Sequence, residues 1–167
     1  MKDVELRLIS ELIKNSRRSD RELAKVLGVS QPTASRMRAR LEKEGLLEYT
    51  AIPDLAKLGL EILAVSIGKR DYPRPPEIAL QEAKDFAKKH PNIIFASAGM
   101  GIRSDWIAIS VHKDYSDYAK LRQELDSEVE GFVITDAFLI SLAGKDVLRP
   151  LSFRYIMDYL KKEKELE

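Results

Sequence analysis

A pair of short helices joined by a tight turn near the start of the chain is the pattern that most constrains the fold. Ser19 and Glu22 have the spacing of a capping box, in which a hydroxyl and a carboxylate bond the free amides at a helix start. Gly28 can end that helix, because glycine takes the left-handed conformation readily. Ser30 can cap a second helix, which ends at Gly45. Two helices joined in this way predict a helix-turn-helix, the unit that places its second helix in the major groove of DNA.

The segments on either side of this pair complete one small domain. A helix with a regular apolar stripe is expected over residues 3–14, and β character over residues 46–52 predicts a wing after the second helix. We therefore assign residues 1–52 to a winged helix-turn-helix domain. Residues 53–60 begin with proline and contain Gly59, which is typical of one capped helical turn, and we assign them as a hinge.

The apolar pattern changes after the hinge. Short apolar runs predict strands, and helical spacing predicts two helices between them: strands over residues 62–67, 93–98, 106–111 and 132–142, helices over residues 77–90 and 114–125. This β-α-β-β-α-β order is that of a ferredoxin-like fold, an antiparallel sheet with helices on one face. Residues 61–167 thus form a second domain, which ends in a further helix over residues 151–166. The whole chain is predicted to belong to the α+β class.

Two of these strands predict contact with a second copy of the chain. A sheet with one wet face alternates apolar and polar residues, whereas residues 62–67 and 106–111 are apolar on both sides. The face without helices is therefore expected to be buried against another sheet. This favours a homodimer joined through the second domain.

Basic residues are concentrated in the helix-turn-helix. Residues 14–43 contain nine basic and three acidic residues, a net charge of +6 in a chain whose formal net charge is +1. A locally basic helix pair on an otherwise acidic chain is typical of a surface that binds nucleic-acid phosphates. We expect double-stranded DNA as the partner, and a dimer would require a pseudo-palindromic target.

The predicted DNA-binding residues fall into two groups. Gln31, Ser35 and Arg36 stand near the start of the second helix and are best placed to contact base edges. The remaining residues are expected to hold the helix pair on the DNA backbone, and they are Arg17, Arg18, Arg21, Ser30, Thr33, Arg38, Arg40 and Lys43. For any one of the arginines, the alternative is a surface charge or an ion pair with Glu42 or Glu44.

Composition and spacing argue against several other kinds of site. The chain has no cysteine, which excludes disulfides and thiolate metal sites. His90 and His112 lack metal-ligand spacing, and no nucleophilic triad or carboxylate pair is visible. We therefore predict no catalytic residue, no metal and no cofactor. Because the sequence has neither a signal-peptide core nor a run of about 20 apolar residues, we expect a cytoplasmic protein with no membrane partner.

The first half of the chain resembles the leucine-responsive regulatory protein family, also called Lrp/AsnC. The run from Arg18 to Ser30 and the motif Tyr49-x-Ala51 carry the resemblance, and the element order extends it over residues 3–142. The resemblance implies a winged helix-turn-helix joined to a ferredoxin-like domain that senses ligands and forms oligomers. It also implies dimers that can assemble further, for example to octamers, and amino acids or other small effectors bound between subunits.

The same resemblance implies where an effector binds. The family's effector loop has the form Gly-x-x-Asp, and the matching loop here offers Gly99, Gly101, Ser104 and Asp105. Three residues rather than two separate Gly101 from Asp105, which departs from the family pattern. A second departure is Arg38, at a position where the family usually has an apolar residue.

Together these patterns predict a DNA-binding transcription regulator that a small effector modulates. Two alternatives stay open. One is an enzyme on the same two-domain fold, as in some decarboxylases of haem biosynthesis, because a fold does not fix a function. The other is a sensing or assembly protein without DNA binding, against which the basic second helix argues.

Overall fold

The computed structural model describes residues 3–71, 75–144, 147–149, 152–156 and 159, and its contacts divide the chain into two compact units. The first unit consists of Met1–Ile52 together with Arg149–Glu167, and the second of Pro53–Leu148. The segment after Leu148 is thus grouped with the first unit, whereas the sequence predicts it in the second domain. Its described part contains the 3-10 helix η1 (Phe153–Tyr155), which contacts the first helix of the chain. Most of the helix expected over residues 151–166 lies outside the described residues.

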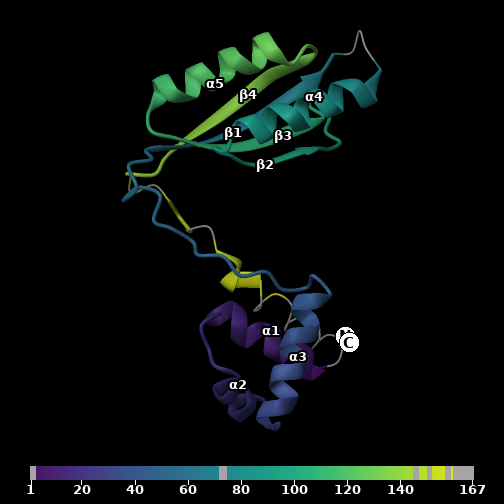
Figure 1. Ribbon diagram of the computed structural model, residues 1–167. Coiled ribbons are helices and arrows are strands. Elements are labelled where there is room, and N and C mark those ends of the chain that lie inside the picture. Colours follow the sequence, from purple (N-terminus) through teal and green to yellow (C-terminus); the bar gives the residue numbers. More distant parts are fainter. Residues whose placement is uncertain (1–2, 72–74, 145–146, 150–151, 157–158, 160–167) are drawn as a thin grey trace. The chain divides into compact units, whose positions relative to one another are not determined.

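Besides η1, the described part of the first unit contains three helices: α1 (Asp3–Lys14), α2 (Asp20–Leu27) and α3 (Gln31–Lys43) (Figure 1). The capping box at the start of α2 is confirmed. The Glu22 carboxylate accepts a hydrogen bond from the Ser19 amide at 2.7 Å, and the Ser19 hydroxyl accepts one from the Glu22 amide at 3.3 Å. Gly28 ends α2 in the left-handed conformation, with φ of 71°. These local bonds fix the turn between α2 and α3.

One apolar core holds the three helices together. Leu8, Leu23 and Leu41, one from each helix, are essentially inaccessible to solvent. Ala34 is buried beside them and Met37 packs against the cluster, so Ala34, Met37 and Leu41 form the inward face of α3. Burial of such side chains stabilises the unit by about 1.5–3 kcal/mol each.

The segment that follows α3 differs from expectation. Residues 46–52 form no strand, although β character is expected there. A strand requires a partner for its backbone amides and carbonyls, and the described part of the first unit contains no other strand. The segment therefore continues from α3 as irregular backbone.

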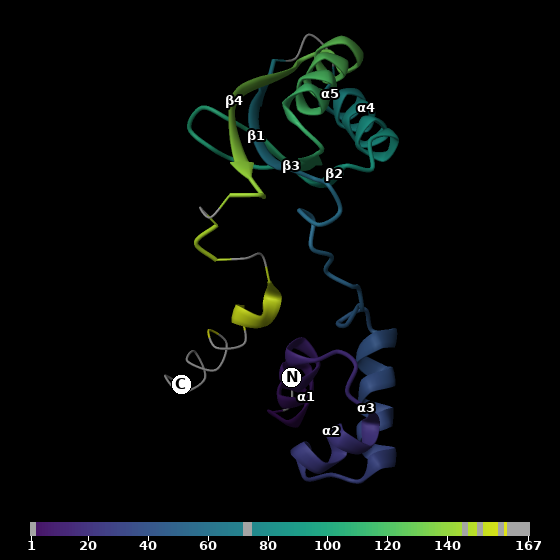
Figure 2. The ribbon, with the colours of Figure 1, turned by 90° about the vertical axis from the view of Figure 1, so that its left-hand side faces the viewer.

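The second unit is a four-stranded antiparallel sheet with two helices. The strands are β1 (Ile62–Arg70), β2 (Ile93–Ala98), β3 (Trp106–His112) and β4 (Phe132–Ser141), in the order β2-β3-β1-β4. The helices α4 (Pro76–Lys89) and α5 (Tyr115–Glu128) lie on one face of the sheet (Figure 2). The predicted β-α-β-β-α-β order and the ferredoxin-like fold are confirmed.

The two faces of this sheet have different surroundings. Trp106, Phe132 and Ile134 pack against Phe86 and other residues of α4 and α5 in the core of the unit. Alternate residues point the opposite way, and that side carries Leu63, Val65 and Ile67 of β1, Ile107 and Ile109 of β3, and Phe138 and Ile140 of β4. We call these seven residues the uncovered face, because no described element of the second unit packs on it. Phe138 is 69% exposed there.

Candidate nucleic-acid interface

The first turn of α3 presents a short exposed surface. The Ser30 hydroxyl accepts a hydrogen bond from the Thr33 amide at 3.3 Å and lies 2.8 Å from the Thr33 hydroxyl, so both side chains take part in the helix cap. Gln31 is exposed directly after the cap, and Ser35 is half-buried one turn later. The start of a helix also carries free amides and a partial positive charge. This end of α3 therefore suits an anionic partner.

Arg36 is the arginine of α3 with the fewest internal partners. Its side chain is exposed, and its Nε atom donates to the Pro32 carbonyl at 3.3 Å. Among the described residues, no carboxylate forms an ion pair with it. Its planar fork of donors remains available for a guanine edge or a phosphate.

Arg38 has the opposite arrangement, because its donors are used within the unit. Its Nε atom donates to Glu42 at 3.0 Å and to the Tyr49 hydroxyl at 3.1 Å, and Nη1 lies 3.4 Å from an Asp20 carboxylate oxygen. Nη1 also donates to the Arg18 carbonyl at 3.1 Å. Burial opposes the charge, but the hydrogen bonds to Glu42, Tyr49 and Asp20 outweigh it and raise the pKa of Arg38. Arg38 thus joins α3 to the start of α2 and to the segment after α3.

Two further arginines of the predicted set are held by carboxylates. Arg40 pairs with Glu5 of α1, and its Nε atom lies 3.7 Å from Glu44. Arg18 pairs with Glu11 at 2.5 Å. For Arg38 and Arg40 the ion pairs with Glu42 and Glu44 are therefore present, as the alternative interpretation of the sequence has it.

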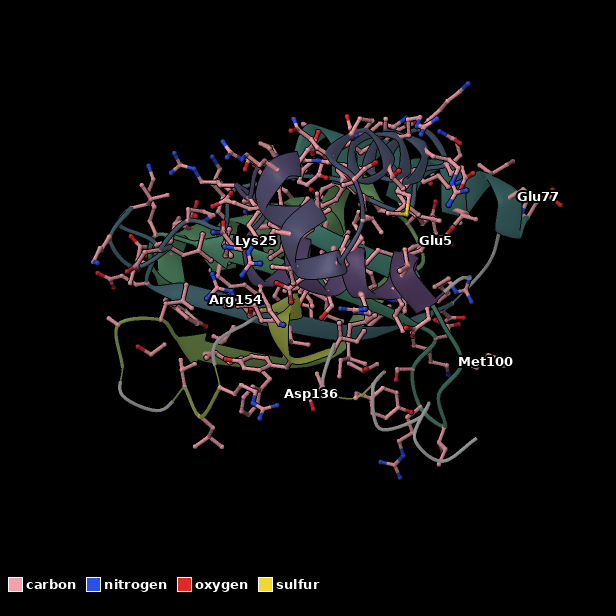
Figure 3. The ribbon with its side chains drawn as sticks, turned by 90° about the horizontal axis from the view of Figure 1, so that it is seen from below. Glu5, Lys25, Glu77, Met100, Asp136 and Arg154 are labelled. Atoms are coloured by element: carbon pink, nitrogen blue, oxygen red, sulfur yellow. The ribbon has the colours of Figure 1, made fainter. Side chains whose placement is uncertain are left out.

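The remaining cations of the set are exposed. Arg17 precedes α2, Arg21 lies in its first turn, and Lys43 ends α3. None of the three has an ion pair among the residues that the structure describes. Lys25 of α2 is a further exposed cation, and Figure 3 labels it together with Glu5. The exposed basic surface of the unit is therefore made by both α2 and α3.

Comparison with known proteins identifies the family. A family model for winged helix-turn-helix DNA-binding domains matches residues 1–48. An HTH-type transcriptional regulator of Pyrococcus furiosus is 30% identical over 134 residues, which are 78% of this chain and 86% of the relative. The HTH-type transcriptional regulator LrpC of Bacillus subtilis is 32% identical over 96 residues, 55% of this chain and 61% of LrpC. The chain belongs to the Lrp/AsnC family of transcriptional regulators.

Solved structures show the fold of an Lrp/AsnC regulator over nearly the whole chain. An AsnC family transcriptional regulator from Agrobacterium tumefaciens superposes with a TM-score of 0.75 at 19% identity, over 96% of this chain and 99% of that one. A transcriptional regulator from Neisseria meningitidis, solved as a complex with L-methionine, gives a TM-score of 0.74 at 16% identity, with coverage of 96% and 99%. The two-unit architecture is therefore that of known regulators.

In this regulator the loop between β2 and β3 holds the predicted effector residues. The Asp105 carboxylate accepts from the Arg70 amide at 2.9 Å and pairs with the Arg70 Nε atom at 3.1 Å. Gly101 lies in a tight turn, where an added Cβ would meet the Ser104 carbonyl at 2.7 Å. The Gly99 amide donates to the Asp105 carbonyl at 2.8 Å. The structure brings these residues together, but it uses the Asp105 carboxylate to tie the loop to β1.

A buried group in the second unit was not anticipated from the sequence. The Ser110 hydroxyl lies 2.8 Å from Nε2 of His112, and an Asp117 oxygen lies 3.4 Å from Nδ1. His112 is fully buried. Burial lowers the pKa of His112, and the neighbouring Asp117 offsets this only in part. Ser110 and His112 share one side of β3, as their i, i+2 spacing allows, but only the folded chain adds Asp117.

Proposed function

We propose that the chain regulates transcription by binding double-stranded DNA through the N-terminal half of α3. The observation that carries the proposal is the contrast within this helix between Arg36, which is exposed without an ion pair among the described residues, and Arg38, which is held by several bonds. An arginine that holds the domain together would have to break its internal bonds to contact DNA, and this would lower the stability of the domain. An exposed arginine near the helix start carries no such cost.

Base recognition in this proposal belongs to Gln31, Ser35 and Arg36. Arginine donates two hydrogen bonds to O6 and N7 of guanine, and glutamine suits adenine, each contact contributing about 1–3 kcal/mol of discrimination. Phosphate contacts belong chiefly to Arg17, Arg21 and Lys43, because Arg18, Arg38 and Arg40 already have carboxylate partners. Ser30 and Thr33 order the first turn of α3 and thereby position its amides.

A homodimer is the proposed working form. The uncovered face is apolar on neighbouring strands, and a second copy of the same sheet would remove it from water. Two copies present two α3 helices, which requires a target with two half-sites about one helical turn, or a multiple of it, apart. Dimers of this kind could associate further into octamers.

A small effector is the proposed regulator of DNA binding. The complex of the Neisseria meningitidis regulator with L-methionine supports an amino acid as its class. In this chain the loop with Gly99, Gly101 and Ser104 is the proposed contact, through its backbone, because Arg70 holds the Asp105 carboxylate. We assign the protein to the cytoplasm, where DNA is accessible, and we assign it no catalytic activity.

Fluorescence anisotropy with DNA from upstream of the protein's own gene, measured across a salt series, tests the proposal. Wild-type protein should bind that DNA more tightly than random DNA, and salt should weaken both. Arg36→Ala should reduce the ratio of the affinity for upstream DNA to that for random DNA roughly 10- to 100-fold. Arg36→Lys is the matched variant: it keeps the charge but not the two-pronged contact, so it should retain affinity for random DNA and lose the preference. Equal, weak binding of wild-type protein to all DNA would refute the proposal.

A further inference from the structure

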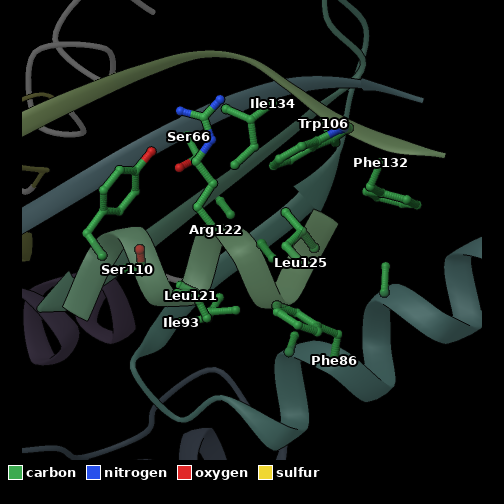
Figure 4. Close-up of a pocket in the computed structure, with 15 residues that line it drawn as sticks. Ser66, Phe86, Ile93, Trp106, Ser110, Leu121, Arg122, Leu125, Phe132 and Ile134 are labelled. Carbon is green, nitrogen blue, oxygen red and sulfur yellow. The ribbon is translucent and has the colours of Figure 1, made fainter. Parts of the chain in front are cut away.

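A largely apolar cavity lies inside the second unit, between the sheet and its two helices (Figure 4). Its volume is about 70 Å³, and its apolar walls include Ala83, Phe86, Ile93, Leu121 and Leu125. A water-sized group needs a volume of roughly 10–15 Å³, so the cavity has space for about five such groups. That is the size of a short, branched hydrocarbon chain.

Two buried polar groups that line this cavity have no hydrogen-bond partner among the described residues. Tyr118 is 4% exposed and Trp106 is 7% exposed. The Tyr118 hydroxyl and the Trp106 indole N–H form no hydrogen bond within the part of the chain that the structure describes. Buried donors are almost always satisfied, and an unsatisfied one costs about 1–3 kcal/mol. These donors indicate a ligand that brings an acceptor atom.

A cation stands where the cavity opens. Arg122 follows Tyr118 by one turn of α5, which places both side chains on the same side of the helix. Both residues also line an open groove of about 330 Å³ along β4, so the groove and the cavity meet there. Figure 4 shows Arg122 extending from α5 toward Ser66 and Ile134. Among the described residues, no side chain forms an ion pair with its guanidinium.

We propose that this cavity binds a short aliphatic carboxylic acid with a chain of about four to six carbons. The carboxylate would accept hydrogen bonds from Arg122 and the Tyr118 hydroxyl, and the alkyl chain would lie between Phe86, Leu121 and Leu125. An arginine and a phenol at the end of an apolar cavity select an anion with an apolar tail. An anion without a tail would leave the apolar cavity unfilled, and an apolar molecule without a charge would leave the arginine and the phenol without a partner. This site is separate from the loop of Gly99–Asp105, and it does not depend on DNA binding.

The single tryptophan of the chain provides the measurement. Because Trp106 lines the cavity, its fluorescence should change on binding, and no other tryptophan contributes. Full-length protein is titrated with 3-methylbutanoate at constant pH and ionic strength. We expect a saturable change in emission, with binding at least about tenfold weaker for acetate, which lacks the chain, and for 3-methylbutan-1-ol, which lacks the charge. Tighter binding of leucine than of the acid would overturn the assigned ligand class.

Variants separate the two parts of the site. Arg122→Gln should weaken binding of the acid at least about tenfold while leaving the alcohol unchanged, and Tyr118→Phe should weaken it several-fold. Ala83→Leu fills the cavity and should abolish the response to both molecules. Lys84→Gln is the matched control, because it removes a positive charge from an exposed position on α4 outside the cavity. The proposal is wrong if wild-type protein shows no saturable response, or if Arg122→Gln and Lys84→Gln bind the acid equally well. Either result is independent of the DNA titration.

Discussion

The two units leave opposite kinds of surface without an internal partner. On the first unit the groups in question include the exposed cations Arg17, Arg21 and Arg36, which form no ion pair among the described residues. On the second unit they are the apolar side chains of the uncovered face, such as Phe138. Exposed cations retain their hydration and attract phosphates over a distance, whereas an apolar face gains free energy only by direct contact. We therefore propose that one unit contacts DNA and that the other mediates assembly.

The same contrast is found within each unit. Arg38 and Arg40 resemble Arg36 in the sequence, yet carboxylates of the same unit hold them. In the second unit, β3 has apolar residues on both sides, yet only the side with Trp106 is covered by helices. Residue type alone therefore does not separate structural from functional groups.

The largest effect is expected on the uncovered face. Phe138→Asp would bury a charge on each copy of the proposed dimer interface, and unpaired buried charges are strongly unfavourable. The dimer dissociation constant should rise at least about 100-fold, measured by sedimentation velocity over a range of concentrations. Ile78→Asp is the control, since Ile78 is 50% exposed on the helical side. A wild-type protein that stays monomeric at micromolar concentration would refute the proposed dimer.

The second effect concerns stability in the first unit. Arg38→Ala removes bonds to Asp20, Glu42 and Tyr49 together, and should lower the free energy of unfolding by about 1–3 kcal/mol. Arg36→Ala should change it by less than about 0.5 kcal/mol, because its side chain is exposed. Urea denaturation followed by circular dichroism measures both. If Arg38→Ala keeps wild-type stability but loses DNA affinity, Arg38 belongs to the interface instead.

The sequence predicts what depends on neighbours along the chain. The capping box of Ser19 and Glu22 and the turn at Gly28 arise within ten residues, and the order of strands and helices along the chain follows from local apolar patterns. The sequence indicates only some of the partners of Arg38. Glu42 lies one helical turn away, whereas Asp20 lies 18 positions before it and was placed by the packing of α2 on α3.

In the second unit, still more of the contacts join residues that are far apart in the sequence and cannot be predicted from local patterns. Arg70 and Asp105 are 35 positions apart, and no local pattern indicates that they pair. The cavity beside Tyr118 and Arg122 depends on how closely the helices approach the sheet, which composition does not determine. The strand expected over residues 46–52 does not form for a related reason, because its backbone would need a second strand elsewhere in the unit to pair with.

A third prediction concerns pH and the buried histidine. Burial lowers the pKa of His112 in the folded protein, so the unfolded chain binds the proton more readily. Stability from this residue is therefore present above the unfolded pKa of about 6.5 and is lost as pH falls through the folded pKa. The melting temperature should fall by a few degrees between pH 7.5 and pH 5.5. His112→Gln should flatten this dependence, and an unchanged dependence in the variant would assign it to other groups.

The smallest effects are expected at the proposed phosphate-binding positions, which lie on both α2 and α3. Arg21→Ala and Lys43→Ala should each weaken binding to specific and random DNA alike, by a few-fold, and each should reduce the slope of log affinity against log salt by about 1. Lys57→Ala, in the second unit, removes an exposed charge without changing the slope. Anisotropy titrations at several salt concentrations separate these outcomes. Because a side chain that binds only phosphate does not distinguish one base from another, its removal leaves sequence preference unchanged. A variant that alters preference without altering the slope would therefore move that residue from the DNA backbone to the base edges.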